Sequence, residues 1–233
     1  MIKTIILDYG KVLAYPISGN WFIPQNLFKI MGLKNTIKLL FKRKKINKAF
    51  ITGNEYLKMN HKLFTEKEEY ELFIQFYTII FSELKMNVKE KIIHTLAQEI
   101  VYNDNKVNFY DDVIDGIKEL KENYKIIIMS DTWPSLKRIL DNYGILQLLD
   151  GLIMSCNYNA TKETTKLFEI AINEYNLIPN ECLFIDDSIS NLKNSEKLGF
   201  IPLLMDRYKE NKQAEYPAIE SLGEIREIIK NRI

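Results

Sequence analysis

The chain is poor in the residues that build disulfide frameworks and zinc sites. Its 233 residues include two cysteines, Cys156 and Cys182, and two histidines, His61 and His94. Two distant cysteines outside any CxxC pair do not make a disulfide framework, so we expect two free thiols in a reducing compartment. The shortage of cysteine and histidine also argues against a zinc site of the usual kind.

The chain also lacks an excess of one charge sign and a long hydrophobic run. Lys and Arg total 32 and Asp and Glu total 31, which leaves a net charge of +1. This balance gives no reason to expect nucleic acid or a membrane surface as a partner. The apolar stretch before Asp8 is too short for a signal peptide, and segment 73–81 is far short of the ~20 residues that span a bilayer. We therefore expect a soluble cytoplasmic protein.

What the chain does have is enough apolar material for a core. Hydrophobic residues make up 46% and charged residues 27% of the sequence, as in an average globular protein. The length exceeds the roughly 150 residues of one typical domain. We expect either one domain with a large insert or a large domain with a small one.

Five short apolar runs alternate with helical patterns. The runs are typical of strands that are buried on both faces of a parallel sheet, because they do not alternate with polar residues. They lie at 4–7, 124–129, 149–154, 182–185 and 200–204, and the helical patterns between them lie at 113–120, 136–140, 168–175 and 192–198. This order predicts a doubly wound α/β fold.

Residues 14–104 have a different pattern, with helical periodicity and no convincing strand. The helical segments are 24–31, 36–50, 54–64, 66–84 and 88–101. Thr52 with Glu55 and Thr65 with Glu68 have the spacing of capping boxes. The sequence thus predicts an α/β core formed by 1–13 and 105–233, with an all-helical domain at 14–104.

One charge run stands out in the helical segment. It contains Lys42, Arg43, Lys44, Lys45 and Lys48. We interpret it as a solvated helix face, and the alternative is a rim that attracts phosphate.

Polar residues follow several of the predicted strands. Asp8, the Ser130–Asp131 pair and the Asp186–Asp187 pair each come at a strand end, and Lys162 precedes a helical pattern. Ligands of open parallel sheets bind beyond these carboxyl ends. Carboxylates that meet there repel one another unless a cation compensates, and hard oxygen ligands suit Mg²⁺. A carboxylate, a hydroxyl, an ammonium group and Mg²⁺ form a set that can transfer a phosphoryl group.

Each of these residues also has an ordinary structural interpretation. Asp8 can cap a strand, Ser130 and the two adjacent aspartates can cap the next helix, and Lys162 can be a surface lysine. Asp131 is a candidate for organising its loop or for contacting substrate. Trp133 is a candidate for gripping the body of a substrate or for ordinary packing.

Four blocks resemble, in order, the motifs of haloacid dehalogenase-like (HAD) hydrolases. The blocks are 5–13 (IILDYGKVL), 126–131 (IIIMSD), Lys162, and 183–187 (LFIDD) with Asn191 after them. The insert after the first motif resembles the helical C1 cap of this superfamily, so the resemblance implies a Rossmann-like core with a helical cap. It implies that Asp8 is the nucleophile, that Ser130 and Lys162 hold the phosphoryl group, and that Mg²⁺ is bound by Asp8, the Gly10 carbonyl, Asp186 and Asp187.

The chain departs from the family pattern at two positions. Family phosphatases usually carry a second Asp two residues after the nucleophile, as the acid that protonates the leaving group, and here that position is Gly10. A general acid contributes about 10²–10⁴-fold, so its loss favours substrates with good leaving groups, such as acyl, aryl or anomeric phosphates. Lys162 is followed by Glu163 where Pro is common, and Lys166 is an alternative for the same role.

These observations predict a Mg²⁺-dependent phosphatase that hydrolyses a small phosphorylated metabolite through an aspartyl-phosphate on Asp8. Ser130, Asp131, Lys162 and Trp133 are the candidate substrate-binding residues. Two alternatives stay open. One is a non-catalytic protein that binds a phosphorylated ligand on the same scaffold, and the other is a metal-independent 2-haloacid dehalogenase.

Overall fold

The computed structural model describes residues 1–209 and 215–232. The chain separates into two compact units. The core unit comprises Met1–Tyr15, Phe109–Thr132 and the described residues from Leu136 onward. The helical unit comprises Pro16–Asn108 and Trp133–Ser135. The helical unit thus combines one long segment with three residues from the start of α6 (Ser135–Asn142) and the loop before it.

The core unit is built on a sheet of six parallel strands. Their order is β5-β4-β1-β6-β7-β8, so the first strand lies in the middle of the sheet. The strands are β1 (Thr4–Leu7), β4 (Lys125–Ser130), β5 (Gly151–Met154), β6 (Cys182–Asp186), β7 (Ile201–Met205) and β8 (Ala218–Ile219). The parallel sheet and the α/β class predicted from the sequence are confirmed, and five strands begin and end within two residues of the predicted runs. The sixth, β8, was not predicted, because two residues leave no pattern to detect.

The central strands are buried on both faces, which explains their unbroken apolar sequence. All four residues of β1 are buried, and Ile6 pairs with Ile127 on one side and with Phe184 on the other. β-Branched and aromatic side chains suit such a pleated, enclosed surface. Because this position is closed to water, the sheet forms a rigid base for the residues that follow its strands.

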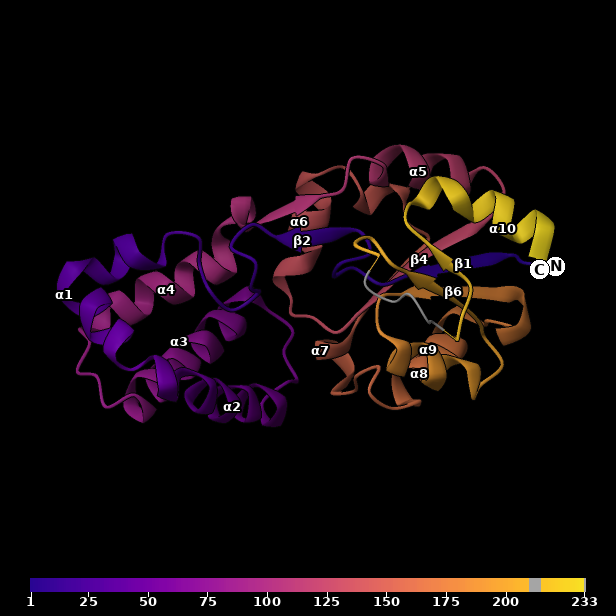
Figure 1. The fold of residues 1–233 in the computed structure, drawn as a ribbon. Coiled ribbons are helices and arrows are strands. Elements are labelled where there is room, and N and C mark those ends of the chain that lie inside the picture. Colours follow the sequence, from indigo (N-terminus) through magenta and orange to yellow (C-terminus); the bar gives the residue numbers. More distant parts are fainter. Residues whose placement is uncertain (210–214, 233) are drawn as a thin grey trace. The chain divides into compact units, whose positions relative to one another are not determined.

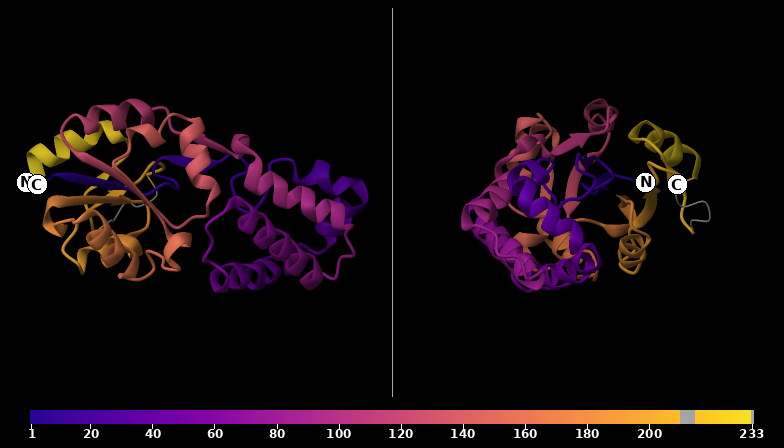
Figure 2. Two further views of the ribbon diagram at one scale, coloured as in Figure 1. Left: turned by 180° about the vertical axis from the view of Figure 1, so that it is seen from behind. Right: turned by 60° about the vertical axis from the view of Figure 1, so that its left-hand side comes forward.

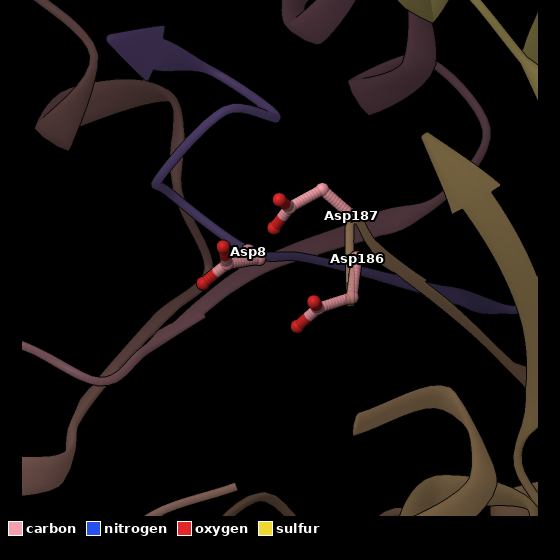
Figure 3. Close-up of side chains that lie close together, drawn as sticks. All are labelled: Asp8, Asp186 and Asp187. Carbon is pink, nitrogen blue, oxygen red and sulfur yellow. The ribbon is translucent and has the colours of Figure 1, made fainter. Parts of the chain in front are cut away.

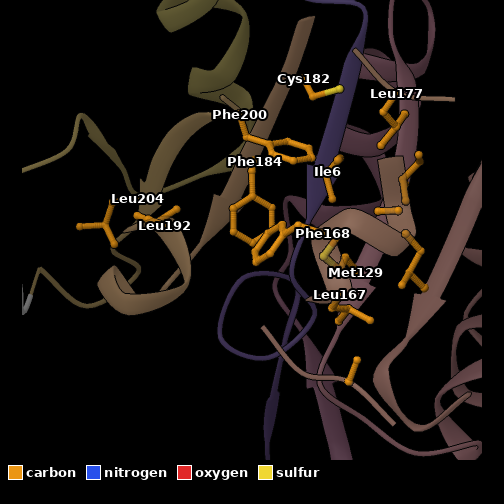
Figure 4. Close-up of a cluster of buried hydrophobic side chains, with 14 residues drawn as sticks. Ile6, Met129, Leu167, Phe168, Leu177, Cys182, Phe184, Leu192, Phe200 and Leu204 are labelled. Atoms are coloured by element: carbon orange, nitrogen blue, oxygen red, sulfur yellow. The ribbon is translucent and has the colours of Figure 1, made fainter. Parts of the chain in front are cut away.

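Helices cover both faces of the sheet, as Figure 1 shows with α5 and α10 on one side and α8 and α9 on the other. The helices of this part of the chain are α5 (Val113–Lys121), α6 (Ser135–Asn142), α7 (Ser155–Tyr158), α8 (Lys166–Tyr175), α9 (Ile189–Glu196) and α10 (Ile225–Arg232). Beneath α8 and α9 lies an apolar cluster that includes Phe168, Phe184 and Leu192 (Figure 4). Cys156 and Cys182 are both buried, and neither is in a disulfide.

The helical unit is built from the α-helices α1 to α4, which Figure 2 shows in indigo to magenta. They are α1 (Leu27–Phe41), α2 (Arg43–Met59), α3 (Glu66–Glu83) and α4 (Glu90–Tyr102). Helix α3 packs against both α2 and α4 and supplies Phe73 and Phe76, which are fully enclosed. Among the described residues, no helix is both long enough and apolar enough to cross a bilayer.

The expected helical insert is therefore present, but its first half differs from the prediction. Three predicted segments are two helices, α1 and α2, and α1 is interrupted at Gly32, whose φ is 69°. The capping box at Thr65 and Glu68 is confirmed. The one predicted at Thr52 is wrong, because Thr52 lies inside α2 and its hydroxyl donates to the carbonyl of Lys48 at 3.3 Å.

The prediction that residues 14–104 hold no strand is also wrong at its edge. Strand β2 (Ala14–Pro16) pairs with β3 (Val107–Phe109) in a separate two-stranded sheet. Strands of three residues are too short to produce a recognisable pattern. Short 3₁₀ helices complete the described chain at Asp104–Lys106, Leu146–Leu148, Pro179–Glu181 and Leu222–Glu224.

Candidate active site

The register of the sheet brings the first polar residues after β1 and β6 to the same level. Leu7 pairs with Ile128 on one side and with Ile185 on the other. The backbone N–H of Asp8 donates to the carbonyl of Ile185 at 2.9 Å, so Asp8 and Asp186 follow neighbouring strands at matching positions. Parallel pairing thus places two carboxylates from distant parts of the sequence beside each other.

Three carboxylates meet at this edge of the sheet (Figure 3). Asp8, Asp186 and Asp187 each offer an oxygen that lies within 4.8 Å of the others. Asp8 and Asp186 are buried and Asp187 is partly buried. Carboxylates this close repel one another and lose hydration, so the arrangement requires positive charge nearby.

Lys162 supplies part of that charge. Its Nζ donates to Oδ1 of Asp8 and, at 2.7 Å, to Oδ2 of Asp186. The residue is only 2% exposed, which excludes the interpretation of Lys162 as a surface lysine. The alternative residue, Lys166, is exposed at the start of α8.

Two backbone contacts fix the position of Lys162. Its N–H donates to Oδ1 of Asp131 at 3.0 Å, and its carbonyl accepts from the Asn194 side chain at 3.0 Å. Asp131 therefore ties the loop after β4 to the loop that carries the lysine. This contact favours the loop-organising interpretation of Asp131.

The charges of the cluster do not balance. Burial raises the pKa of Asp8 to about 8, and the nearby carboxylates of Asp186 and Asp187 act in the same direction while Lys162 opposes them. Burial would lower the pKa of Lys162, but the carboxylates of Asp186 and Asp8 outweigh it and raise that pKa, so the lysine stays charged. Two ammonium groups, of the buried Lys162 and of the exposed Lys11 beside Asp187, thus face three carboxyl groups, and the site can accept a further cation.

The two adjacent aspartates differ in how far their oxygens are already engaged. Asp186 accepts from the Ser188 N–H at 2.8 Å, from the Asn191 amide at 3.1 and 3.2 Å, and from Lys162. Asp187 makes one ion pair, with Nζ of Lys11 at 3.5 Å, and its side chain is 28% exposed. Asp187 therefore keeps more free lone pairs for a ligand than Asp186 does.

The remaining predicted residues of the core unit, Ser130 and Gly10, lie at the end of β4 and just after β1. Ser130 is the last residue of β4 and is buried. It stands two residues past Ile128, the partner of Leu7, so it reaches beyond the level of Asp8. Gly10 lies in the turn after β1 and forms an isolated bridge with Ala14.

The structure assigns Trp133 to the helical unit, apart from the other candidate residues. Its ring packs edge-on against Phe22 at 5.8 Å and Phe73 at 5.4 Å between ring centroids, and against His61 at 6.0 Å. Trp133 is thus part of an aromatic cluster of the helical unit.

Sequence reasoning missed two residues that shape the carboxylate cluster. Lys11, with a left-handed φ of 58°, reaches Asp187 from the turn after β1. Asn194, on α9, holds the carbonyl of Lys162. Neither position carried a signal, because each depends on a contact between segments that are far apart in the sequence. Asn191, which lies in the fourth block, donates its side-chain N–H groups to Asp186.

The comparison with protein families agrees with this architecture. The model of the haloacid dehalogenase-like hydrolases matches residues 2–194, which include every residue of the carboxylate cluster. The chain belongs to this family of hydrolases. The helical unit corresponds to the expected C1-type cap.

Two curated relatives are phosphatases. The chain is 29% identical over 129 residues to an enolase-phosphatase E1 from Shewanella loihica, a match that covers 52% of this chain and 55% of the relative. It is 28% identical over 118 residues to a D-ribitol-5-phosphate phosphatase from Bacteroides thetaiotaomicron, covering 45% and 57%. The matches thus span little more than half of each relative.

Solved structures share the fold over nearly the whole chain. An L-2-haloacid dehalogenase from Xanthobacter autotrophicus with chloropropionic acid covalently bound has a TM-score of 0.68 at 14% identity, covering 100% of both chains. A HAD family enzyme from Bacteroides thetaiotaomicron, in complex with magnesium and inorganic phosphate, has a TM-score of 0.63 at 18% identity, covering 90% of this chain and 97% of the other. At these identities the likeness concerns the fold.

Proposed function

We propose that the protein is a Mg²⁺-dependent phosphatase that hydrolyses a small phosphomonoester through an aspartyl-phosphate on Asp8. One observation carries the proposal. The carboxylate of Asp8 contacts Lys162 and lies within 4.8 Å of carboxylate oxygens of Asp186 and Asp187. The excess of carboxylates over ammonium groups suits both a divalent cation and a phosphoryl group bound to it. The phosphatase activity of the two curated relatives supports the same reaction class.

The donor set at the cluster fits Mg²⁺, because hard carboxylate oxygens are the ligands this ion prefers. Asp8 and Asp187 would hold the ion, with the Gly10 carbonyl as a further oxygen ligand. Asp186 would orient Lys162 and stay in place through its bonds to Ser188 and Asn191. When bound, Mg²⁺ would neutralise the negative charge of the phosphoryl oxygens.

The proposed reaction has two steps, of which the first uses Asp8 as the nucleophile and the second consumes water. A carboxylate oxygen of Asp8 attacks phosphorus, the bond from phosphorus to the leaving-group oxygen breaks, and the leaving group departs with that electron pair. Lys162 and the Ser130 hydroxyl stabilise the negative charge of the transferring group. Water then attacks phosphorus and gives a proton to the solvent, the bond from phosphorus to the Asp8 oxygen breaks, and inorganic phosphate leaves with the carboxylate of Asp8 restored.

Gly10 bears on which substrates react. A glycine cannot protonate the leaving group as a carboxylic acid would, and a general acid contributes about 10²–10⁴-fold. We propose that the natural substrate has a leaving group that departs without a proton, such as an acyl, aryl or anomeric phosphate.

The test is turnover of p-nitrophenyl phosphate with Mg²⁺ and with a chelator. We expect activity that needs the metal and falls by at least about 10³-fold in Asp8→Asn, because the nucleophile is lost. Asp115→Asn is the matched control, since Asp115 is an exposed residue of α5, and it should keep wild-type activity.

The same assays distinguish the alternatives. If the protein released chloride from 2-chloropropionate at the same rate with and without a chelator, it would be a metal-independent dehalogenase and the proposal would be wrong. No turnover across a panel of phosphate esters would favour a non-catalytic protein that binds a phosphorylated ligand.

A second experiment tests the role of Gly10. Rates of the wild type and of Gly10→Asp are measured on phenyl phosphates whose leaving groups differ in acidity. We expect the wild-type rate to fall steeply as the leaving group becomes more basic, and the added carboxylic acid to flatten that dependence. Equal slopes in the two proteins would contradict the proposed effect of the missing acid.

A further inference from the structure

The even charge balance of the chain conceals a strongly basic segment. Residues 25–54 contain eight basic and no acidic side chains. Since the whole chain carries +1, the rest of it carries a net charge of −7. The segment forms α1 and the first part of α2 in the helical unit, so the positive charge is gathered on two consecutive helices.

Helix α1 also exposes a row of large apolar side chains. Leu33 and Phe41 are 78% and 86% exposed, and Ile37 and Leu40 are exposed between them. Positions 33, 37, 40 and 41 have the i, i+4, i+7, i+8 spacing of one helix face. Only Met31 of the fifteen residues of α1 is buried. The apolar face of this helix is thus directed away from the core of its own unit.

Basic side chains border this apolar row. Lys34 and Lys38 each follow an apolar residue of the row by one position and are exposed. Arg43, Lys44, Lys45 and Lys48 continue the basic character into α2 and are exposed as well. Among the described residues, the structure gives none of these six a carboxylate partner. We call the four apolar and six basic residues together the α1–α2 face.

We propose that the α1–α2 face binds the surface of a membrane that contains anionic phospholipids. An amphipathic helix with an exposed apolar stripe and flanking Lys and Arg lies in the plane of such a surface, with the apolar side chains between the headgroups. Anionic headgroups attract the bordering cations. A membrane surface of this kind would thus contact both the apolar row and the basic side chains.

A nucleic acid or a second copy of the chain would suit either the basic or the apolar side chains of this face, but not both. A nucleic acid would satisfy the cations through its phosphates but would leave the four large apolar side chains of α1 without a role. A second copy of the chain that paired through the same face would set six basic residues against six, which repel one another. The proposal concerns residues other than those of the carboxylate cluster, so it stands apart from the proposed phosphatase activity.

The test is co-sedimentation of the full chain with vesicles. One preparation is phosphatidylcholine alone and the other contains 30% phosphatidylserine. We expect binding to the anionic vesicles only, and a decrease of that binding at high salt. The double variant Lys44→Gln/Lys45→Gln should bind at least about tenfold more weakly, because each cation near the surface contributes severalfold to affinity. Leu33→Ser/Phe41→Ser should also weaken binding severalfold while p-nitrophenyl phosphate turnover is unchanged.

Matched variants make the result specific to this face. Lys67→Gln/Lys91→Gln removes the same charge from exposed lysines of α3 and α4 in the same unit. Ile178→Ser removes an exposed apolar side chain of the core unit. Both should bind anionic vesicles as the wild type does, and a loss equal to that of the α1–α2 variants would overturn the proposal.

Three further outcomes would also overturn it. These are binding to neither vesicle preparation, equal binding to both, and tight binding to an oligonucleotide that Leu33→Ser/Phe41→Ser leaves unaltered. The last result would assign the face to nucleic acid. A dimer in solution that Leu33→Ser/Phe41→Ser converts to monomer would instead show that a second copy covers the apolar row.

Discussion

Each unit of the molecule contains a buried carboxylate beside a lysine, and the two differ in their balance of charge. In the helical unit, Glu69 is 1% exposed and accepts the N–H and the hydroxyl of Ser135 at 2.7 and 2.8 Å. Lys106 acts on it electrostatically and donates to the carbonyl of Ile100. In the core unit, three carboxyl groups outnumber the buried ammonium group of Lys162 and the exposed one of Lys11. The first cluster is satisfied by the chain itself, and the second is not.

This difference separates a structural use of buried charge from a functional one. Burial raises the pKa of Glu69 and lowers that of Lys106, and the attraction between the two opposes both shifts. The hydrogen bonds to Ser135 hold the Glu69 carboxylate in one position, as buried charges require. The core cluster instead holds more carboxyl groups than ammonium groups at the end of the sheet, so either a proton on Asp8 or a bound cation relieves the repulsion. A local imbalance of this kind is a better indication of a ligand site than burial of charge by itself.

The largest effect is expected for Lys162→Met. Removing the ammonium group leaves three carboxylates together, and breaking a buried ion pair typically costs about 3–5 kcal/mol. Denaturant unfolding without metal should therefore show a large loss of stability, and Mg²⁺ should restore part of it. Lys193→Met, at an exposed residue of α9, is the control. A loss as small as that of the control would mean that Lys162 does not balance the cluster.

A smaller loss is expected for Glu69→Gln. The amide offers one oxygen acceptor in place of two, so one of the two Ser135 donors is left facing an NH₂ group, which costs about 1–3 kcal/mol. Glu71→Gln, an exposed residue of the same helix, should be neutral. The Mg²⁺ dependence of turnover should stay that of the wild type in both variants. A change in that dependence for Glu69→Gln would contradict the structural role assigned to this cluster.

Asp8→Asn should change the stability in the opposite direction from the two preceding variants, because it should stabilise the metal-free protein. In the folded state the pKa of Asp8 is raised to about 8, so the folded protein binds more protons than the unfolded chain between about pH 4 and pH 8. The wild type should therefore lose stability as the pH rises through this range. The variant should lack this part of the slope and be more stable at pH 8, by about 1–2 kcal/mol.

The measurement is the free energy of unfolding at several pH values, for the wild type, Asp8→Asn and the surface control Asp115→Asn. Mg²⁺ should reduce the difference between wild type and Asp8→Asn, because a bound cation lowers the pKa of Asp8. Parallel pH curves for wild type and Asp8→Asn would show that Asp8 titrates normally.

The smallest effects are expected at Thr52 and Thr65, two threonines that both have the capping-box spacing in the sequence. Thr65→Ala removes the hydroxyl that caps α3, and we expect a loss of about 1 kcal/mol. Thr52→Ala lies inside α2, where alanine is the better helix former, so stability should be unchanged or rise slightly. Thermal unfolding of both variants checks the pair, and an equal loss in both would mean that Thr52 also caps a helix.

The sequence predicted the features that depend on local pattern. The five long strands, the helical insert and the Thr65 capping box all leave a periodic or spaced signal of a few residues. It also identified Asp8, Asp186 and Asp187 as candidates, because carboxylates at strand ends are unusual enough to notice. Lys162 was a candidate because it precedes a helical pattern and resembles the third family motif. It failed at β2, β3 and Thr52, where the pattern is too short or is shared by another structure.

Tertiary contacts decided the rest. Nothing in the sequence distinguishes Asp186 from Asp187. In the structure, the oxygens of Asp186 accept hydrogen bonds from Ser188, Asn191 and Lys162. Asp187 makes a single ion pair. Trp133 follows the strand that ends at Ser130, yet its ring packs in the helical unit. Hydrogen bonds and ring contacts between distant segments produce both results.

The sequence by itself determined which side chains are chemically able to bind a cation and receive a phosphoryl group, and that they follow the strands of a parallel sheet. Only the folded chain determined their distances, their burial and the excess of three carboxyl groups over the ammonium groups of Lys162 and Lys11. The physical reason is that residue type and spacing act within a few residues along the chain. Electrostatic energy depends instead on the separation of charges in space and on the water removed from around them.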